Sequence, residues 1–484
     1  MNWVVLGFFV ILLTARFFSE TLRVIPKAFD LVDLVFIPLL AVGAVFAGSS
    51  LKGVDKPLHR KLMRWTVTLA VLSVVSSIAN VERSHWAPTL QYIFGIAAGP
   101  ALYLSLNALI RNKAKMAEQT ARFLYFMFIV EGVVVLFVSL PLFFSTGNPD
   151  YVSGTFGQNA YQFSVLLIII GGYFLGKMRF GQTRFVISLG IQIGVVVTFL
   201  LLQYRTATPA FFAAYLVLIG LLYGKRVVRL TFYVGLMGAV GFYAFGYVAS
   251  SNIDLKFDDI ITFFQNPEMA TDFGKVIAYG NTFQMYSDQP STVLFGAGPG
   301  TMVSRAAYTF IMEPMVSTQK GVGALITSTF PNQSFRTDVF TEYMEPLFDL
   351  ESVFGSVQAN NPASSILAAM AEIGIPGLVL LVLIYGTMLK RVFQYARFAI
   401  AHVDPQLVPL SSALVTGSVY LCFLSPLDNY LEIARVTLPV WLLFWTVSSM
   451  VHLRKQLRLM ERIEREEALA EMLHQQNPVH APTR

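Results

Sequence analysis

Residues 363–389 read ASSILAAMAEIGIPGLVLLVLIYGTML, an apolar run that contains a single charged side chain, Glu372. A helix that crosses a lipid bilayer needs about 20 mostly apolar residues, so this stretch predicts a transmembrane helix. Asn361 can cap that helix, and Pro362 suits its first position. Similar runs recur on both sides of it. Together they predict an all-α polytopic membrane protein.

Composition supports this fold class. Hydrophobic residues make up 55% of the chain and charged residues only 13%, whereas soluble domains carry about 25% charged residues. Charge this sparse cannot cover the surface of so long a chain, so most of that surface must face lipid. The net charge of +6 resides in short loops, where it orients helices, and we expect no nucleic-acid partner. The single cysteine, Cys422, excludes an intrachain disulfide.

We place about twelve spans along the chain. The first, MNWVVLGFFVILLTARF, lacks a basic segment and a cleavage site, so we read it as a retained helix. The expected organisation is helices one to nine in 1–250, a large loop in 251–362, helices ten to twelve in 363–452 and a charged helical tail in 453–484. The spans lie near 1–15, 31–50, 62–80, 88–110, 122–145, 161–176, 183–203, 207–223, 227–250, 363–389, 407–426 and 433–452.

Basic residues mark every even-numbered connection. Because positive loops remain on the cytoplasmic side, both termini are expected in the cytoplasm, with the multi-pass chain in the inner (plasma) membrane. The acidic segment 251–362 would then be extracytoplasmic, and its length predicts short helices of its own. The marking residues are Lys52, Lys56, Arg60, Lys61, Arg111, Lys113, Lys115, Lys177, Arg179, Arg184, Lys225, Arg226, Arg229, Lys390, Arg391, Arg397, Arg454, Lys455 and Arg458.

Two places near the outer surface are candidates for binding a phosphate. Arg205, in QYRTATP (203–209), lies between two apolar runs. Its planar guanidinium suits two phosphate oxygens at once, although an arginine there can instead extend its charge to lipid headgroups. The entry to the tenth span, Asn360-Asn361-Pro362 and then Ser364, presents free N–H groups outward. That entry is either an anion site or simply a well-capped helix.

Two further features also have alternative interpretations. VLFGAGPG (293–300) places Gly296, Gly298 and Gly300 close together. Glycines this dense permit the backbone to approach a ligand or another chain segment closely, or merely form a tight turn that packs the loop on the bundle. Glu372 is a carboxylate inside a span, a functional candidate by default. The alternative is a carboxyl group that is neutral, or that pairs with an arginine purely for structure. In either case we expect a partner from another helix or from the large loop. The sequence shows no metal-ligand spacing and no nucleotide-binding loop.

These segments, in this order, resemble the O-antigen ligase and polymerase superfamily of bacterial membrane glycosyltransferases. GTFGQNAYQFSVLLIII is similar to the loop that leads into a helix with an early Asn, here Asn159. YRTATPAFFAAYLVLIGLL resembles the arginine segment, with Tyr204 and Arg205. GKVIAYGNTFQMYSDQPSTVLFGAGPG resembles the Gly-Arg stretch before a G-x-G-x-G, with Lys275 where the family often has arginine. ASSILAAMAEIGIPG resembles the segment after the large loop, with Glu372 matched.

Two departures from the family pattern favour a polymerase over a ligase. The family's ligases begin the last motif with a histidine, whereas this chain has Ala363 followed by Ser364, with Asn360-Asn361 as a displaced counterpart. Lys275 keeps the charge of the family's arginine but loses its two-pronged geometry.

The resemblance implies a GT-C-like fold and a transfer reaction on lipid-linked sugars. A glycan on undecaprenyl diphosphate would be joined to a lipid-linked acceptor repeat unit without metal or cofactor. Expected partners are membrane lipids, a flippase and a chain-length regulator. The catalytic candidates are Arg205, Lys275 and Glu372; the substrate-binding candidates are Asn159, Tyr204, Gly296, Gly298, Gly300, Asn360, Asn361, Ser364, Arg305 and Arg336.

Besides a purely structural assembly subunit, two other functions remain open at this point. One is an O-antigen ligase that transfers glycan onto lipid A–core or protein. The other is a transporter, such as a flippase of lipid-linked oligosaccharide or a carrier of small solutes. A transporter is expected to show inverted repeats and helices broken near the middle of the membrane. The absence of a visible repeat and the outer position of the candidate charges favour an enzyme.

Overall fold

The computed structural model describes residues 2–26, 32–46, 54–202, 204, 207–224, 227, 274–312, 314, 326, 328–329, 333–349 and 364–476. Throughout these ranges the regular elements are helices. The predicted ninth span, 227–250, lies outside them apart from Val227. The same holds for much of the predicted loop 251–362, and for Arg205, Asn360 and Asn361.

Eight helices in the described ranges are long and apolar enough to cross a membrane. This confirms an all-α, multi-pass membrane protein, while the count of twelve spans stays a prediction. Three shorter apolar helices, α2 (Val32–Phe46), α8 (Phe185–Leu201) and α9 (Thr208–Tyr223), coincide with further predicted spans. The eight long apolar helices are α1 with η1 (Asn2–Thr21), α3 (Lys56–Ala79), α4 (Trp86–Leu109), α5 to α6 (Lys113–Thr146), α7 (Ala160–Arg179), α19 (Ser365–Ala401), α20 (Leu407–Leu424) and α21 (Ala434–Gln476, apolar in its first part).

Burial separates a central layer of helices from helices that face outward. α20 packs against α7, α9, α19 and α21, and the tryptophans Trp441 and Trp445 of α21 are fully buried in this layer. In contrast, α3 leaves Val67, Val71 and Ile78 exposed along one side. An apolar stripe on the outside of a helix is what a lipid environment favours, because the hydrocarbon core imposes no penalty on it.

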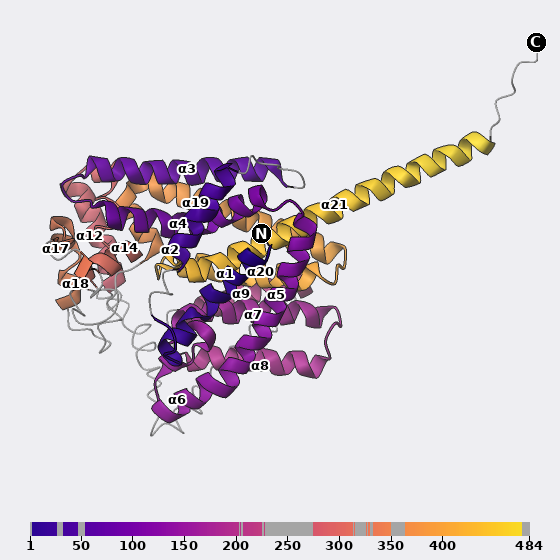
Figure 1. The fold of residues 1–484 in the computed structure, drawn as a ribbon, viewed down its shortest axis with the longest axis horizontal. Coiled ribbons are helices and arrows are strands. Elements are labelled where there is room, and N and C mark those ends of the chain that lie inside the picture. Colours follow the sequence, from indigo (N-terminus) through magenta and orange to yellow (C-terminus); the bar gives the residue numbers. More distant parts are fainter. Residues whose placement is uncertain are drawn as a thin grey trace, which may run out of the picture.

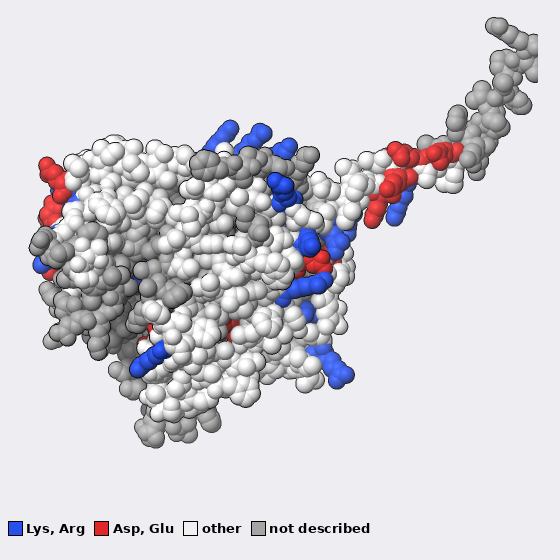
Figure 2. Space-filling view, viewed as in Figure 1, with Lys and Arg blue, Asp and Glu red and all other residues white. Residues whose placement is uncertain are grey.

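Short helices gather at one end of the bundle and the α21 tail leaves from the other (Figure 1). Most of the Lys and Arg side chains in view also lie toward the end from which α21 projects (Figure 2). The described part of the large loop is folded into helical turns, as its length predicted. They are α12 (Gly274–Asp288), α13 (Thr292–Phe295), α14 (Arg305–Ala307), η8 (Tyr308–Met312), α17 (Asp338–Tyr343) and α18 (Pro346–Asp349).

Two helices differ from their predicted extents. α19 continues to Ala401 rather than ending near residue 389, and α21 joins the last predicted span to the charged tail as far as Gln476. Inside α19 the helix is interrupted at Gly374, whose φ is +78° and ψ is −177°. Glycine tolerates this left-handed conformation because it has no Cβ. The interruption leaves the carbonyl groups just before it available to another segment.

Candidate functional site

The Glu372 carboxylate is held by backbone amides of the large loop. Its oxygens accept hydrogen bonds from the N–H groups of Gly300 (2.5 Å), Met302 (3.0 Å), Val303 (2.8 Å) and Ser304 (2.9 Å). The Glu372 side chain has no exposed surface. A buried carboxylate is tolerated only when such donors replace its water shell. The expected partner from the large loop is therefore confirmed. These contacts hold the backbone of residues 300–304 against α19. A catalytic role for Glu372 stays a prediction.

The glycine-rich segment approaches the backbone of α19 closely. The N–H of Ala297 donates to the carbonyl of Ala371 (2.8 Å) and that of Gly298 to the carbonyl of Glu372 (3.1 Å). A Cβ on Gly296 would overlap the backbone of Glu372, and Gly296 has a φ of +66°. Of the alternatives for these glycines, the structure shows close packing on another chain segment, the backbone of α19. Binding of a ligand by Gly296, Gly298 and Gly300 stays a prediction.

The first turn of α19 is fastened to the connection between α20 and α21. The hydroxyl of Ser364 accepts from the N–H of Leu367 (3.3 Å) and donates to the carbonyl of Ser425 (3.1 Å). The N–H of Ser365 donates to the carbonyl of Asp428 (3.1 Å). Ser364 is thus the N-cap of α19, a position that favours Ser because its oxygen satisfies an unpaired N–H group. The expected cap, Asn361, lies outside the described ranges; the observed cap is three residues later.

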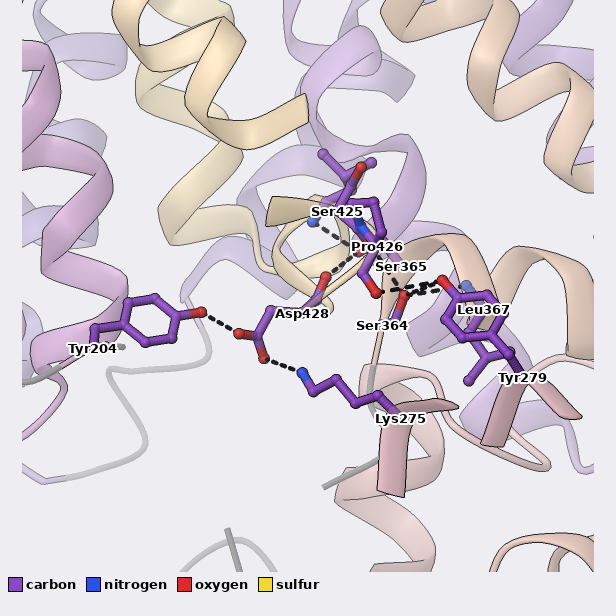
Figure 3. A network of polar contacts seen from close by, with 10 residues as sticks. Tyr204, Lys275, Tyr279, Ser364, Ser365, Leu367, Ser425, Pro426 and Asp428 are labelled. Atoms are coloured by element: carbon purple, nitrogen blue, oxygen red, sulfur yellow. Dashed lines mark hydrogen bonds and ion pairs between the residues drawn. The ribbon is translucent and has the colours of Figure 1, made fainter. Parts of the chain in front are cut away.

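Asp428 brings together three segments that are far apart in the sequence. Lys275 of α12 places its Nζ 3.6 Å from Oδ1 of Asp428. The hydroxyl of Tyr204, from the connection between α8 and α9, donates to Oδ2 of the same carboxylate. Figure 3 shows both side chains directed at Asp428 from different elements. The predicted residues Tyr204 and Lys275 therefore meet, through an aspartate that the sequence analysis did not select.

A second side chain of α12 reaches the same place. The hydroxyl of Tyr279 lies 3.1 Å from the hydroxyl of Ser364 and donates to the carbonyl of Pro426 (3.3 Å), as Figure 3 also shows. We call Tyr204, Lys275, Tyr279, Ser364 and Asp428 the Asp428 cluster. It joins α12 of the large loop to the α19 N-terminus and to the end of the bundle.

The cluster is half-buried and its charges influence one another. The side chain of Lys275 is 18% exposed and that of Asp428 is 22% exposed. Burial raises the pKa of Asp428, while Lys275 and the Tyr204 hydroxyl act to lower it. Burial lowers the pKa of Lys275, and Asp428 acts to raise it. A buried charge is costly unless it has a partner of opposite sign. An anion that enters the cluster can therefore compete with Asp428 for Lys275.

The start of α7 lies beside the cluster. Asn159 is the N-cap of α7, and its side-chain oxygen accepts from the N–H of Gln162 (3.1 Å). Two residues later, the ring of Tyr161 packs on the ring of Tyr204 with centroids 4.6 Å apart. The cap explains why an Asn precedes this apolar helix. Binding of substrate by Asn159 stays a prediction.

The two predicted arginines of the large loop have other neighbours. The N–H of Arg305 donates to Oε2 of Glu432 (2.6 Å), and its guanidinium lies over the ring of Tyr308 at 4.8 Å. Arg336 forms an ion pair with Glu345 within the loop. Arg336 is thus used to hold the loop together.

Sequence reasoning missed Asp428, Tyr279 and Glu432. A usable signal was present for the two acidic residues, since SPLDNYLE (425–432) places two carboxylates in a short connection between apolar spans. These acidic residues could have been selected on the same ground as Glu372, because a carboxylate near hydrocarbon requires a partner.

Among the described residues, no group of three or more His, Cys, Asp or Glu side chains is arranged to hold a metal ion. The Asp428 cluster instead combines one cation, one carboxylate and three hydroxyl groups, which suits binding and proton transfer on a polar, anionic ligand. No protein-family model matches the chain, and no curated protein aligns with it as a relative.

Proposed function

We propose that this protein is a polysaccharide polymerase of an exopolysaccharide or O-antigen pathway. It transfers a glycan from undecaprenyl diphosphate onto a lipid-linked acceptor repeat unit. The observation that carries the proposal is the convergence at Asp428. Segments matched one by one in the sequence, namely the start of α7, Tyr204, Lys275 and the α19 N-terminus, meet at one end of the bundle.

The chemistry of the cluster fits a diphosphate leaving group. Departure of the lipid diphosphate concentrates negative charge on oxygen, and a fixed cation in a half-buried site stabilises that charge better than water does. Lys275 supplies the cation, and it shares the Asp428 carboxylate with the hydroxyl group of Tyr204. Arg205, which follows Tyr204 in the sequence, would add a second cation. Because the leaving group is already on the lipid, the reaction needs no nucleotide, and we propose that these cations take the place of a metal ion.

The proposed place of the reaction is the outer face of a bacterial inner membrane. The distribution of basic side chains in Figure 2 supports a cytoplasmic end at the α21 tail, whereas α12, which carries Lys275 of the Asp428 cluster, lies at the opposite end in Figure 1. In this orientation both termini are cytoplasmic, and a twelve-span, GT-C-like arrangement carries the large loop outside. Lipid-linked repeat units would arrive through a flippase, and a chain-length regulator would act on the product.

Deletion of the gene provides the test. Cells without the protein are expected to lose long polymer and to accumulate a single lipid-linked repeat unit. Lys275→Met should reproduce the loss at a normal protein level. The control is Lys177→Met, since Lys177 lies over the rings of Tyr125 and Tyr173 near the last turn of α7. Normal polymer in the deletion strain would reject the proposal. Intact polymer that remains on undecaprenyl diphosphate and is no longer joined to lipid A–core would instead identify a ligase.

A further inference from the structure

We infer that Asp428 removes the proton from the attacking acceptor hydroxyl, and that Lys275 leaves Asp428 for the donor diphosphate when the donor binds. This inference rests on the proposed function and adds a catalytic base to it. It also assigns Tyr204 as the positioning residue that keeps the carboxylate oriented after Lys275 has moved.

The position of Asp428 is determined independently of its carboxylate. Its carbonyl accepts from both the N–H (3.1 Å) and the hydroxyl (3.3 Å) of Ser365 at the start of α19. The hydroxyl of Ser365 is also an acceptor for the N–H of Leu431 (3.0 Å). The N–H of Asp428 also donates to the carbonyl of Leu424 (2.8 Å), so the backbone on both sides of Asp428 is hydrogen-bonded without its side chain.

Accessibility separates Asp428 from the other carboxylates nearby. Glu372 has no exposed surface and its oxygens already accept four backbone N–H groups. Glu432 is 4% exposed and accepts from the N–H of Arg305. The Asp428 side chain is 22% exposed and adjoins the cation of the site. A general base must be within hydrogen-bond reach of the proton that it accepts, and of these three carboxylates Asp428 is the most exposed.

The reaction balances without a further reactant. The acceptor oxygen forms a bond to the anomeric carbon of the donor sugar while the bond from that carbon to the diphosphate oxygen breaks. The electron pair of the broken bond leaves with the lipid diphosphate. The hydroxyl proton passes to an Asp428 oxygen and later to water.

The Lys275–Asp428 ion pair makes the base depend on the donor. While Lys275 lies 3.6 Å from Oδ1, it stabilises the carboxylate and weakens its attraction for a proton. A diphosphate carries more negative charge than one carboxylate and therefore competes for the lysine. Once Lys275 has moved, Asp428 binds a proton more strongly. The hydrogen bond from Tyr204 to Oδ2 then leaves Oδ1 to face the acceptor.

The dependence of rate on pH gives a direct readout. The groups that face Asp428 are Lys275 of α12, Tyr204, Tyr430 of η10 (Tyr430–Glu432) and Tyr420 of α20. Protonation of Asp428 would abolish its function as a base, so the rate should fall on the acid side. Because burial raises the pKa of Asp428, this fall should lie above pH 3.8, the ordinary pKa of an aspartate.

The experiment uses membranes that contain the full chain, and the lipid-linked oligosaccharide that accumulates in deletion cells serves as substrate. Asp428→Asn should lower kcat roughly 10²–10⁴-fold, the usual contribution of a general base, with little change in KM. Asp428→Glu should retain part of the rate and shift the acid limb. The control is Asp404→Asn, because Asp404 is a shielded aspartate that pairs with Arg454 (2.9 Å) at the other end of α20.

Rescue by a small carboxylate separates a base from a structural group. Addition of formate should restore part of the rate to Asp428→Gly, whereas a purely structural aspartate gives no rescue. Failure of the wild-type membranes to elongate the substrate would reject the proposed function itself. Elongation by wild type together with a full rate in Asp428→Asn would overturn the role of Asp428 alone. If Asp428→Asn is not produced at a normal level, an unshifted acid limb in Asp428→Glu would overturn it.

Discussion

The carboxylate of Glu372 accepts a 2.9 Å hydrogen bond from the backbone N–H of Ser304, although the two residues are 68 positions apart in the chain. Three further N–H groups between Gly300 and Val303 point at the same carboxylate. Consecutive N–H groups that converge in this way form an anion-binding concavity, and here the anion is a side chain of α19. This contact fastens the large loop to the bundle, and the loop in turn carries α12 with Lys275 and Tyr279.

Glu372→Gln should destabilise the protein. The amide keeps one acceptor oxygen but turns an NH2 group toward N–H groups that need an acceptor. An unsatisfied buried donor costs about 1–3 kcal/mol. Thermal unfolding of the purified protein in detergent, followed by tryptophan fluorescence, measures the loss. Glu118→Gln is the control, because Glu118 pairs with Arg122 on an exposed surface. Equal unfolding temperatures for Glu372→Gln and wild type would contradict the assigned role.

Gly296→Ala should separate the glycine segment from α19. The new Cβ would overlap the backbone of Glu372, and alanine is strained at the φ of +66° found there. Limited proteolysis of membranes should cut the large loop of this variant faster than that of wild type. Gly280→Ala in the neighbouring α12 is the control, since a Cβ added at Gly280 would meet nothing within 4 Å. That variant should resist proteolysis as well as wild type.

Arg205→Ala should abolish long polymer while the protein remains in the membrane at its normal level. Loss of a preorganised charged donor at a leaving group costs about 10²–10³ in rate. Arg205→Lys should restore only part of the polymer, because an ammonium group cannot bind two phosphate oxygens in one plane. Polymer length is read on gels, with protein level checked by blotting. An arginine that only extends its charge to lipid headgroups predicts the reverse pattern. In that case Arg205→Lys would be fully active and Arg205→Ala almost fully active.

The two ends of the bundle should lie on opposite sides of the membrane. In a Cys422→Ser background, Ser334→Cys in the loop and Ala468→Cys in the α21 tail both place a thiol at an exposed position. A membrane-impermeant maleimide should label Ser334→Cys in intact cells. It should label Ala468→Cys only after the membrane has been opened. Labelling of the tail in intact cells would overturn the orientation.

The membrane fold could be predicted from the sequence because hydropathy is a local property. Each apolar run meets the length requirement on its own, and the positions of α3, α4, α7 and α20 follow from their own residues. The sequence also indicated that Glu372 must have a partner, since its charge lies inside an apolar run. It could not identify that partner, because the donors are backbone N–H groups, which every residue except proline has.

The hydrogen bond from Tyr204 to Asp428, which joins residues 224 positions apart, could not be predicted from hydropathy. It depends on how α9, α12 and the α19 N-terminus pack at one end of the bundle, and no periodicity or spacing records that packing. Local hydropathy and charge specify that the chain spans a membrane and which residue types lie near its surface. Packing of distant segments selects which of those residues share a site, because a half-buried lysine and aspartate are stable only where such segments bring them into contact.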